Sequence, residues 1–132
     1  MNMIDPWNPT KEEIIKWAYS NELMPDQDWE LAVYDIENID LIIKLACDSE
    51  CKHREFFLGC LYVFTGDIIA SEDNDKLIKL KSILLKASRR VEPEVVDWIA
   101  RSSDLIVHPE KYSYKYWGLD SAYVYKWRLK HD

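Results

Sequence analysis

Residues 56–64 constrain the fold more than any other part of the chain, because they are apolar on every side of a helix. The stretch reads FFLGCLYVF, with no charged residue in nine positions. A helix that is apolar all round lies at the centre of a domain. Nine residues also fall far short of the ~20 that span a bilayer. We therefore expect a central helix from about residue 51 to 64, closed by Gly66, with its core at Phe56, Phe57, Leu61 and Phe64.

Helix signals dominate the rest of the chain. Thr10 and Glu13 have the spacing of a capping box, and Asn38 precedes apolar residues spaced by three and four. Asp73 precedes a long amphipathic stretch, and Pro93 has the position that proline favours in a first turn. We expect further helices at 11–18, 29–33 and 39–46, a long one after 73–75, one from 93 through 99, and a last one at 120–129, with 102–109 an irregular connection.

Composition indicates one packed domain. The 132 residues are 48% hydrophobic and 31% charged, which is ordinary globular usage. Three glycines and five prolines are too few for a Gly-rich phosphate loop, a β-sandwich or a flexible linker. We predict that residues 1–132 form a single all-α domain. Six or seven short helices would pack as antiparallel hairpins, either in a bundle or in a HEAT-like stack.

The cysteines predict reduced, structural thiols. Cys47, Cys51 and Cys60 are odd in number and lie among apolar residues. No positively charged segment followed by an apolar run opens the chain, so we expect a cytoplasmic protein with no membrane segment. Together with His53 these thiols have the chemistry of a zinc site, but not the spacing of the usual ligand pairs. We expect no metal and no cofactor.

Catalytic signals are weak. No nucleophile or general-base motif surrounds the three histidines. Cys51 precedes Lys52, His53 and Arg54, whose positive charges would lower its pKa and make it a reactive thiol. An enzyme that uses Cys51 or His53 therefore stays an open alternative. The acids at 26, 28, 30 and 37 have calcium-loop spacing, yet Leu31 stands where that loop needs glycine. We predict that the chain is not an enzyme.

Charge lies in blocks along the chain. Residues 20–50 hold nine acids against the single base Lys44, whereas residues 76–90 hold six bases and no acid. The net charge of −7 makes nucleic acid an unlikely partner for the whole chain. Aromatic and basic residues alternate in the tail 111–128, which we interpret as a segment that docks on the core rather than a surface for single-stranded nucleic acid.

Several short segments resemble small all-helical bacterial proteins of unassigned role. They are Trp17-Ala18-Tyr19, Pro25-x-Gln27-Asp28-Trp29, the run at 51–58, Leu61-Tyr62 and Gly66-Asp67. In size, acidity and helical character the chain is also similar to the immunity proteins of toxin–immunity systems. That likeness implies binding and neutralisation of a cognate toxin, often a basic nuclease.

Two functions follow from these patterns. The first is a non-enzymatic protein-binding module, an immunity protein that neutralises a basic toxin through an acidic face. Its expected partner-binding residues are Asp26, Asp28, Trp29, Glu30, Tyr34, Asp35 and Glu37, with the two aromatic residues as anchors if exposed. The alternative is a helical scaffold or regulator that binds a peptide or nucleic acid through a basic stripe, Lys79, Lys86, Arg89 and Arg90. A solvated acidic surface without a partner explains the same acids.

Overall fold

The structure is a computed structural model that describes residues 5–25, 29–34, 36–113 and 117, without the side chains of Glu30, Leu31 and Ile36. The described part is helical and contains no strand, which confirms the all-α class. The number of helices and the hairpin stack stay predictions, because the expected last helix at 120–129 lies outside the described residues. The elements are α1 (Lys11–Ala18), α2 (Glu30–Val33), η1 (Ile36–Asn38), α3 (Ile39–Cys47), α4 (Arg54–Ser71), α5 (Asn74–Ala87), α6 (Pro93–Val107) and η2 (Pro109–Lys111).

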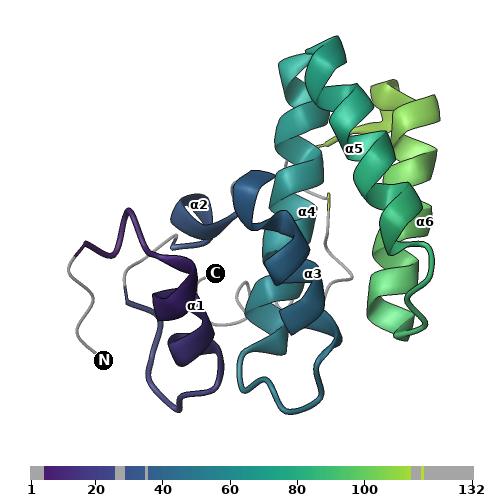
Figure 1. The fold of residues 1–132 in the computed structure, drawn as a ribbon. Helices are drawn as coiled ribbons and strands as arrows, with labels where there is room; N and C mark the ends of the chain where they lie inside the picture. Colours follow the sequence, from purple (N-terminus) through teal and green to yellow (C-terminus); the bar gives the residue numbers. More distant parts are fainter. Residues whose placement is uncertain (1–4, 26–28, 35, 114–116, 118–132) are drawn as a thin grey trace.

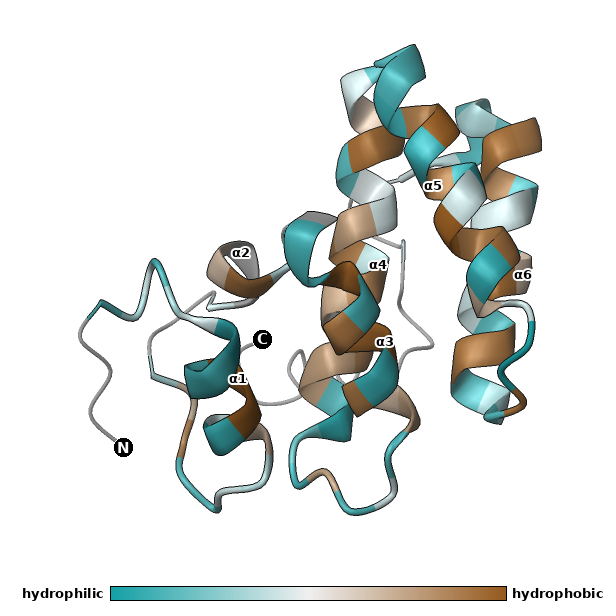
Figure 2. Cartoon of the chain, viewed as in Figure 1, coloured by the Kyte–Doolittle hydropathy of each residue, from teal (hydrophilic) through white to brown (hydrophobic). Residues whose placement is uncertain are grey.

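Helix α4 is the centre of the molecule, as its apolar sequence predicts. It contacts α2 and α3 on one side and α5 and α6 on the other (Figure 1). Phe57 and Leu61 are fully buried, and Phe56 and Phe64 nearly so. In Figure 2 this helix is tan to brown over much of its length, whereas most of the loops are teal. No helix in the described residues is both long enough and apolar enough to cross a membrane.

The bounds predicted for α4 are wrong at both ends. The helix begins at Arg54 rather than near residue 51, and it continues through Gly66 to Ser71. Glu72, with φ of 55°, ends it in the left-handed conformation. Gly66 is instead a contact point: a Cβ there would lie 3.0 Å from Trp117 Cδ1 and 3.3 Å from Tyr112 Cε2. The helix continues because Ile68 and Ile69, after the glycine, are also buried.

Helix α6 is longer than predicted, because residues 102–107 are helical rather than irregular. Ser102 and Thr65 are both fully buried, and their hydroxyl oxygens lie 3.1 Å apart. The Trp98 indole donates to the Leu61 carbonyl at 3.0 Å and to Thr65 Oγ1 at 3.1 Å. These hydrogen bonds satisfy buried polar groups on two helices at once. They keep the second half of α6 packed on α4.

Two of the predicted caps are present and one is not. Thr10 and Glu13 form the reciprocal capping box at α1. Asp73 accepts hydrogen bonds from the backbone N–H groups of the first turn of α5. Asn38 makes no side-chain cap for α3, because its amide donates to the Val33 carbonyl at 3.1 Å.

Candidate partner-binding surface

Two loops that are distant in sequence lie together at one end of the molecule. They are the loop after α1, residues 19–25, and the loop between α3 and α4, residues 48–53 (Figure 1). The Lys52 backbone N–H donates to the Ala18 carbonyl at 2.8 Å, and the Cys51 thiol donates to the same carbonyl at 3.4 Å. The Tyr19 hydroxyl donates to Asp48 Oδ2 at 2.5 Å. These hydrogen bonds therefore join the two loops.

The hydrogen bond between Tyr19 and Asp48 shifts the pKa of both groups. Donation to the carboxylate raises the pKa of Tyr19 to about 12, because loss of its proton would place two negative charges in contact. The same bond lowers the pKa of Asp48, with help from the Glu50 backbone N–H, which donates to Asp48 Oδ1 at 2.9 Å. Asp48 is therefore negatively charged, and its carboxylate connects the two loops through the hydrogen bond from Tyr19.

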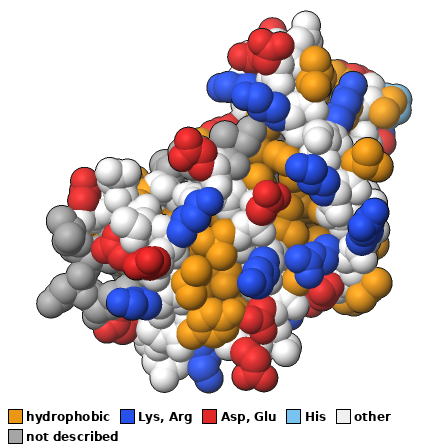
Figure 3. All heavy atoms as spheres, viewed as in Figure 1, with side chains coloured by type: hydrophobic (Ala, Val, Ile, Leu, Met, Phe, Trp, Pro, Cys, Tyr) orange, Lys and Arg blue, Asp and Glu red, His pale blue; other side chains and the backbone are white. Residues whose placement is uncertain are grey.

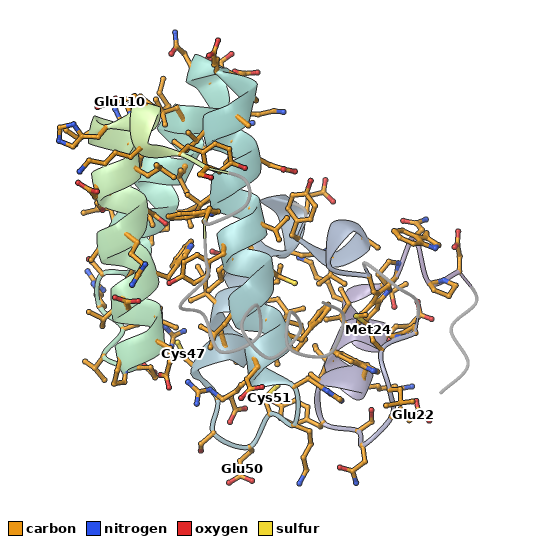
Figure 4. All side chains as sticks on the ribbon, turned by 180° about the vertical axis from the view of Figure 1, so that it is seen from behind. Glu22, Met24, Cys47, Glu50, Cys51 and Glu110 are labelled. Atoms are coloured by element: carbon orange, nitrogen blue, oxygen red, sulfur yellow. The ribbon has the colours of Figure 1, made fainter. Side chains whose placement is uncertain are left out.

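This end carries both acids and an exposed apolar residue. We name it the acidic end and define it by Tyr19, Glu22, Leu23, Asp48 and Glu50. Leu23 has 90% of its surface exposed, next to Glu22, while its carbonyl accepts a hydrogen bond from the buried Trp17 indole at 3.0 Å. Glu22 and Glu50 lie at this end in Figure 4. The acidic end thus exposes a leucine and carboxylates, and the buried Trp17 indole fixes the backbone at Leu23 by a hydrogen bond.

The predicted partner-binding acids are only partly described. Asp26, Asp28 and Asp35 lie outside the described residues, and Glu30 belongs to α2 with its side chain undescribed. Glu37 is exposed in the first turn of η1. These acids therefore stay predicted contacts.

The two aromatic residues that were predicted to anchor a partner differ in how far they are buried. Trp29 is fully buried, and its indole donates to the Pro6 carbonyl at 2.5 Å. The expectation that it anchors a partner is therefore corrected, since a partner cannot reach it. Tyr34 is half-buried, and its hydroxyl donates to Asp67 Oδ2 on α4.

Acids that the structure describes occupy both ends of α3. Glu37 and the exposed Asp40 lie at its start, whereas Asp48 and Glu50 follow its end. At 1.5 Å per residue, Asp40 and Asp48 are separated by about 12 Å along the helix axis. The described acids of the block are thus spread along α3 rather than gathered in one tight cluster.

An aromatic cluster lies behind the acidic end. The Trp17 ring stacks on His53 at 3.8 Å between centroids, and it meets Trp29 and Phe56 edge-on, each at 4.9 Å. Phe57 packs against Phe56 at 5.1 Å. These residues belong to the segments on which the resemblance to bacterial helical proteins rests. Their role in this chain is to join α1, α2 and α4.

The structure gives no support to a reactive thiol. Cys51 is buried, and burial raises its pKa, although three basic residues follow it. Burial also lowers the pKa of His53, so the ring is held neutral rather than as a cation that would stabilise a thiolate. Burial, together with Glu92, raises the pKa of Cys47 to about 11. The described residues hold no cluster of three His, Cys, Asp or Glu that could bind a metal ion.

One cavity of about 540 Å³ lies far from these groups. Ile68, Leu77, Ile106 and Tyr112 are among its lining residues, at the C-terminal end of α4. Cys51 and His53 precede the N-terminal end of that helix, which has 18 residues and is therefore about 27 Å long. The cavity cannot serve a reaction at Cys51 or His53.

The basic stripe is exposed. Lys79 and Lys86 lie on α5, and Arg89 and Arg90 follow its end. Figure 3 shows blue side chains spread over α5 and its surroundings, beside exposed orange ones.

Comparisons with protein-family models, curated proteins and solved structures found no match to this chain.

Proposed function

We propose that this chain is a non-enzymatic protein-binding module that acts as an immunity protein, holding a basic toxin against the acidic surface formed by residues 20–50. The acidic end is the observation that carries the proposal. It combines charge with an exposed leucine on a backbone that hydrogen bonds hold in place. An acidic face that is only solvated requires neither an exposed leucine nor hydrogen bonds that fix its backbone.

Each part of this surface has a separate role in the proposal. Acids steer a basic partner and raise the association rate, an effect that salt weakens. Leu23 contributes apolar contact, as the anchors at the centre of interfaces do. Loops that are already ordered lose less entropy when they bind.

The test is co-expression with the product of the neighbouring gene, using growth and complex recovery as readouts. A fivefold variant changes Asp26, Asp28 and Asp35 to Asn and Glu30 and Glu37 to Gln. A matched control changes five acids outside the block, Glu12, Glu72, Asp75, Glu94 and Glu110, to the corresponding amides. We expect the wild type and the control to restore growth and to form a complex, and the fivefold variant to do neither. A third variant, Glu22→Gln with Glu50→Gln, tests the acidic end itself, and protection by all three variants equal to that of the wild type would contradict the proposal.

The second candidate is a scaffold that binds nucleic acid or an acidic peptide through the basic stripe. The exposure of Lys79, Lys86, Arg89 and Arg90 favours it. Binding of a labelled single strand, measured by anisotropy at rising salt, distinguishes the two candidates. Affinity that falls steeply with salt and is lost on changing these four residues to Gln would favour the scaffold.

A further inference from the structure

Helices α5 and α6 expose an apolar strip on the face turned away from α4. On α5, Ile78 is 63% exposed and Leu85 is 75% exposed, and their spacing of seven places them on one side of the helix. On α6, Val96 and Val107 are exposed, and the half-buried Ile99 and Ile106 belong to the same face. We name these six residues the α5–α6 strip.

An open groove runs along the middle of the α5–α6 strip. Leu84 and Leu85 from α5 and Ile99 and Ile106 from α6 line an open groove of about 360 Å³ between the two helices. Lys81, Ser88 and Ser103 complete its lining. Contiguous exposed apolar surface of this kind on a helical protein marks an interaction site.

Opposite charges border the strip. Lys79, Lys86 and Asp97 each directly follow an exposed strip residue, at 78, 85 and 96, and Asp104 follows the groove residue Ser103. One residue is a turn of about 100° on a helix, so each charge lies on the flank beside the strip. Because α5 and α6 run in opposite directions (Figure 1), the lysines border one side and the aspartates border the other.

We propose that the α5–α6 strip is the contact between two copies of this chain, related by a two-fold axis parallel to the helices. In that arrangement α5 of one copy lies over α6 of the other. The lysine flank then meets the aspartate flank twice, with the same spacing of seven residues on each. A uniformly acidic or uniformly basic partner would instead meet a flank of its own sign.

The aspartates remain available for such contacts. Asp97 pairs with Arg101 at 2.8 Å and Asp104 pairs with Lys111 at 3.4 Å, but half or more of each carboxylate side chain is exposed. Exposed ion pairs of this kind contribute little to stability, so the aspartates can exchange them for contacts with a second copy. The dimer surface and the acidic end lie on opposite sides of α4 (Figure 1), so one chain can use both.

Sedimentation equilibrium of the full chain tests the dimer. We expect the wild type to sediment at twice the chain mass of 15.7 kDa, and Leu85→Glu to sediment at the chain mass. Leu23→Glu is the matched control, since it places the same change at an even more exposed leucine far from the strip, and it should remain dimeric. Circular dichroism checks that each variant is folded. A monomeric wild type, or a dimeric and folded Leu85→Glu variant, would overturn the proposal.

A charge exchange tests the stated orientation. One variant carries Lys79→Glu and Lys86→Glu, and the other carries Asp97→Lys and Asp104→Lys. Each alone would bring like charges together at both flanks and should be monomeric, whereas their equimolar mixture should recover the dimer mass. If the mixture stays monomeric, or if each variant dimerises as tightly as the wild type, the proposed pairing of the flanks is wrong.

Discussion

Trp17 and His53 stack face to face, with ring centroids 3.8 Å apart and ring planes inclined by 10°. The contact joins α1 to the residue that immediately precedes α4. His53 Nε2 is buried in this stack without a hydrogen-bond partner among the described residues. A neutral imidazole tolerates that site better than a cation does, because a buried charge without a partner loses its solvation.

His53 therefore makes stability depend on pH. Its pKa is lowered in the folded chain, mainly by burial, so the unfolded chain binds the proton more readily below the ordinary histidine pKa of 6.5. The free energy of unfolding should fall as pH drops through 6.5 toward the lower folded pKa. Urea unfolding of wild type and His53→Phe, which keeps an aromatic ring on Trp17, should show a flatter pH dependence in the variant. An unchanged slope in His53→Phe would contradict this account.

The three thiols should react slowly in the folded chain. Cys60 is fully buried, burial raises the pKa of Cys51, and the pKa of Cys47 is raised to about 11. Because the thiolate is the reactive form, a disulfide reagent near neutral pH should modify all three much more slowly than in urea. One thiol that reacts in the folded chain as fast as a free cysteine would show a reactive site that this structure does not contain.

Gly66→Ala should destabilise the protein although it removes a glycine from a helix. Alanine gains about 1 kcal/mol of helix propensity, but its methyl group meets Trp117, which cannot easily move because its indole donates to the Tyr62 carbonyl at 2.6 Å. Overpacking costs about 1–3 kcal/mol, so we expect a net loss of about 1 kcal/mol. In a Trp117→Ala background the same change should become stabilising. Chemical unfolding of the four proteins measures this, and the same sign in both backgrounds would show that Trp117 is not the residue that opposes the methyl group.

Leu23→Ala should weaken partner binding without affecting the fold. Leu23 is almost fully exposed, so its truncation removes little buried surface from the free protein. Burying a leucine side chain at an interface is worth about 2 kcal/mol, which predicts roughly a thirtyfold faster dissociation with little change in association. Surface plasmon resonance with the purified partner gives both rates. Val91→Ala, another exposed apolar site in a loop, is the control and should match the wild type.

Local signals were sufficient to predict much of the fold. The capping box at Thr10, the cap at Asp73 and the apolar periodicity of α3 and α5 act within a few residues, and each element begins where those signals lie. The apolar character of 56–64 predicted the centre of the core for the same reason. Such features depend on neighbours in the chain, and the sequence displays those directly.

The errors arise where distant contacts outweigh local preference. Glycine commonly ends helices, yet Gly66 lies inside α4. Trp117, 51 positions later in the chain, packs against it there. Ser102 lies in α6 because its hydroxyl contacts Thr65 in the core. Trp29 lies within a run of acids but is fully buried, and its indole donates to the Pro6 carbonyl, 23 positions away.

In the candidate site, too, local features could be predicted from the sequence and distant contacts could not. The excess of acids in residues 20–50 is evident from the sequence, whereas the acidic end is created by hydrogen bonds between two loops about 30 residues apart. No pattern near Leu23 indicated that its backbone would be held by Trp17 while its side chain faces outward.

The association rate of the purified partner, measured over a salt series, tests the central claim most directly. The acids of 20–50 are proposed to steer a basic protein, so the fivefold variant Asp26→Asn, Asp28→Asn, Glu30→Gln, Asp35→Asn and Glu37→Gln should associate about tenfold more slowly at low salt and show a shallower salt dependence. The matched control, with five amides outside the block, should keep most of the wild-type rate and slope. A folded fivefold variant whose association rate and salt slope equal those of the wild type would show that these acids only solvate the surface.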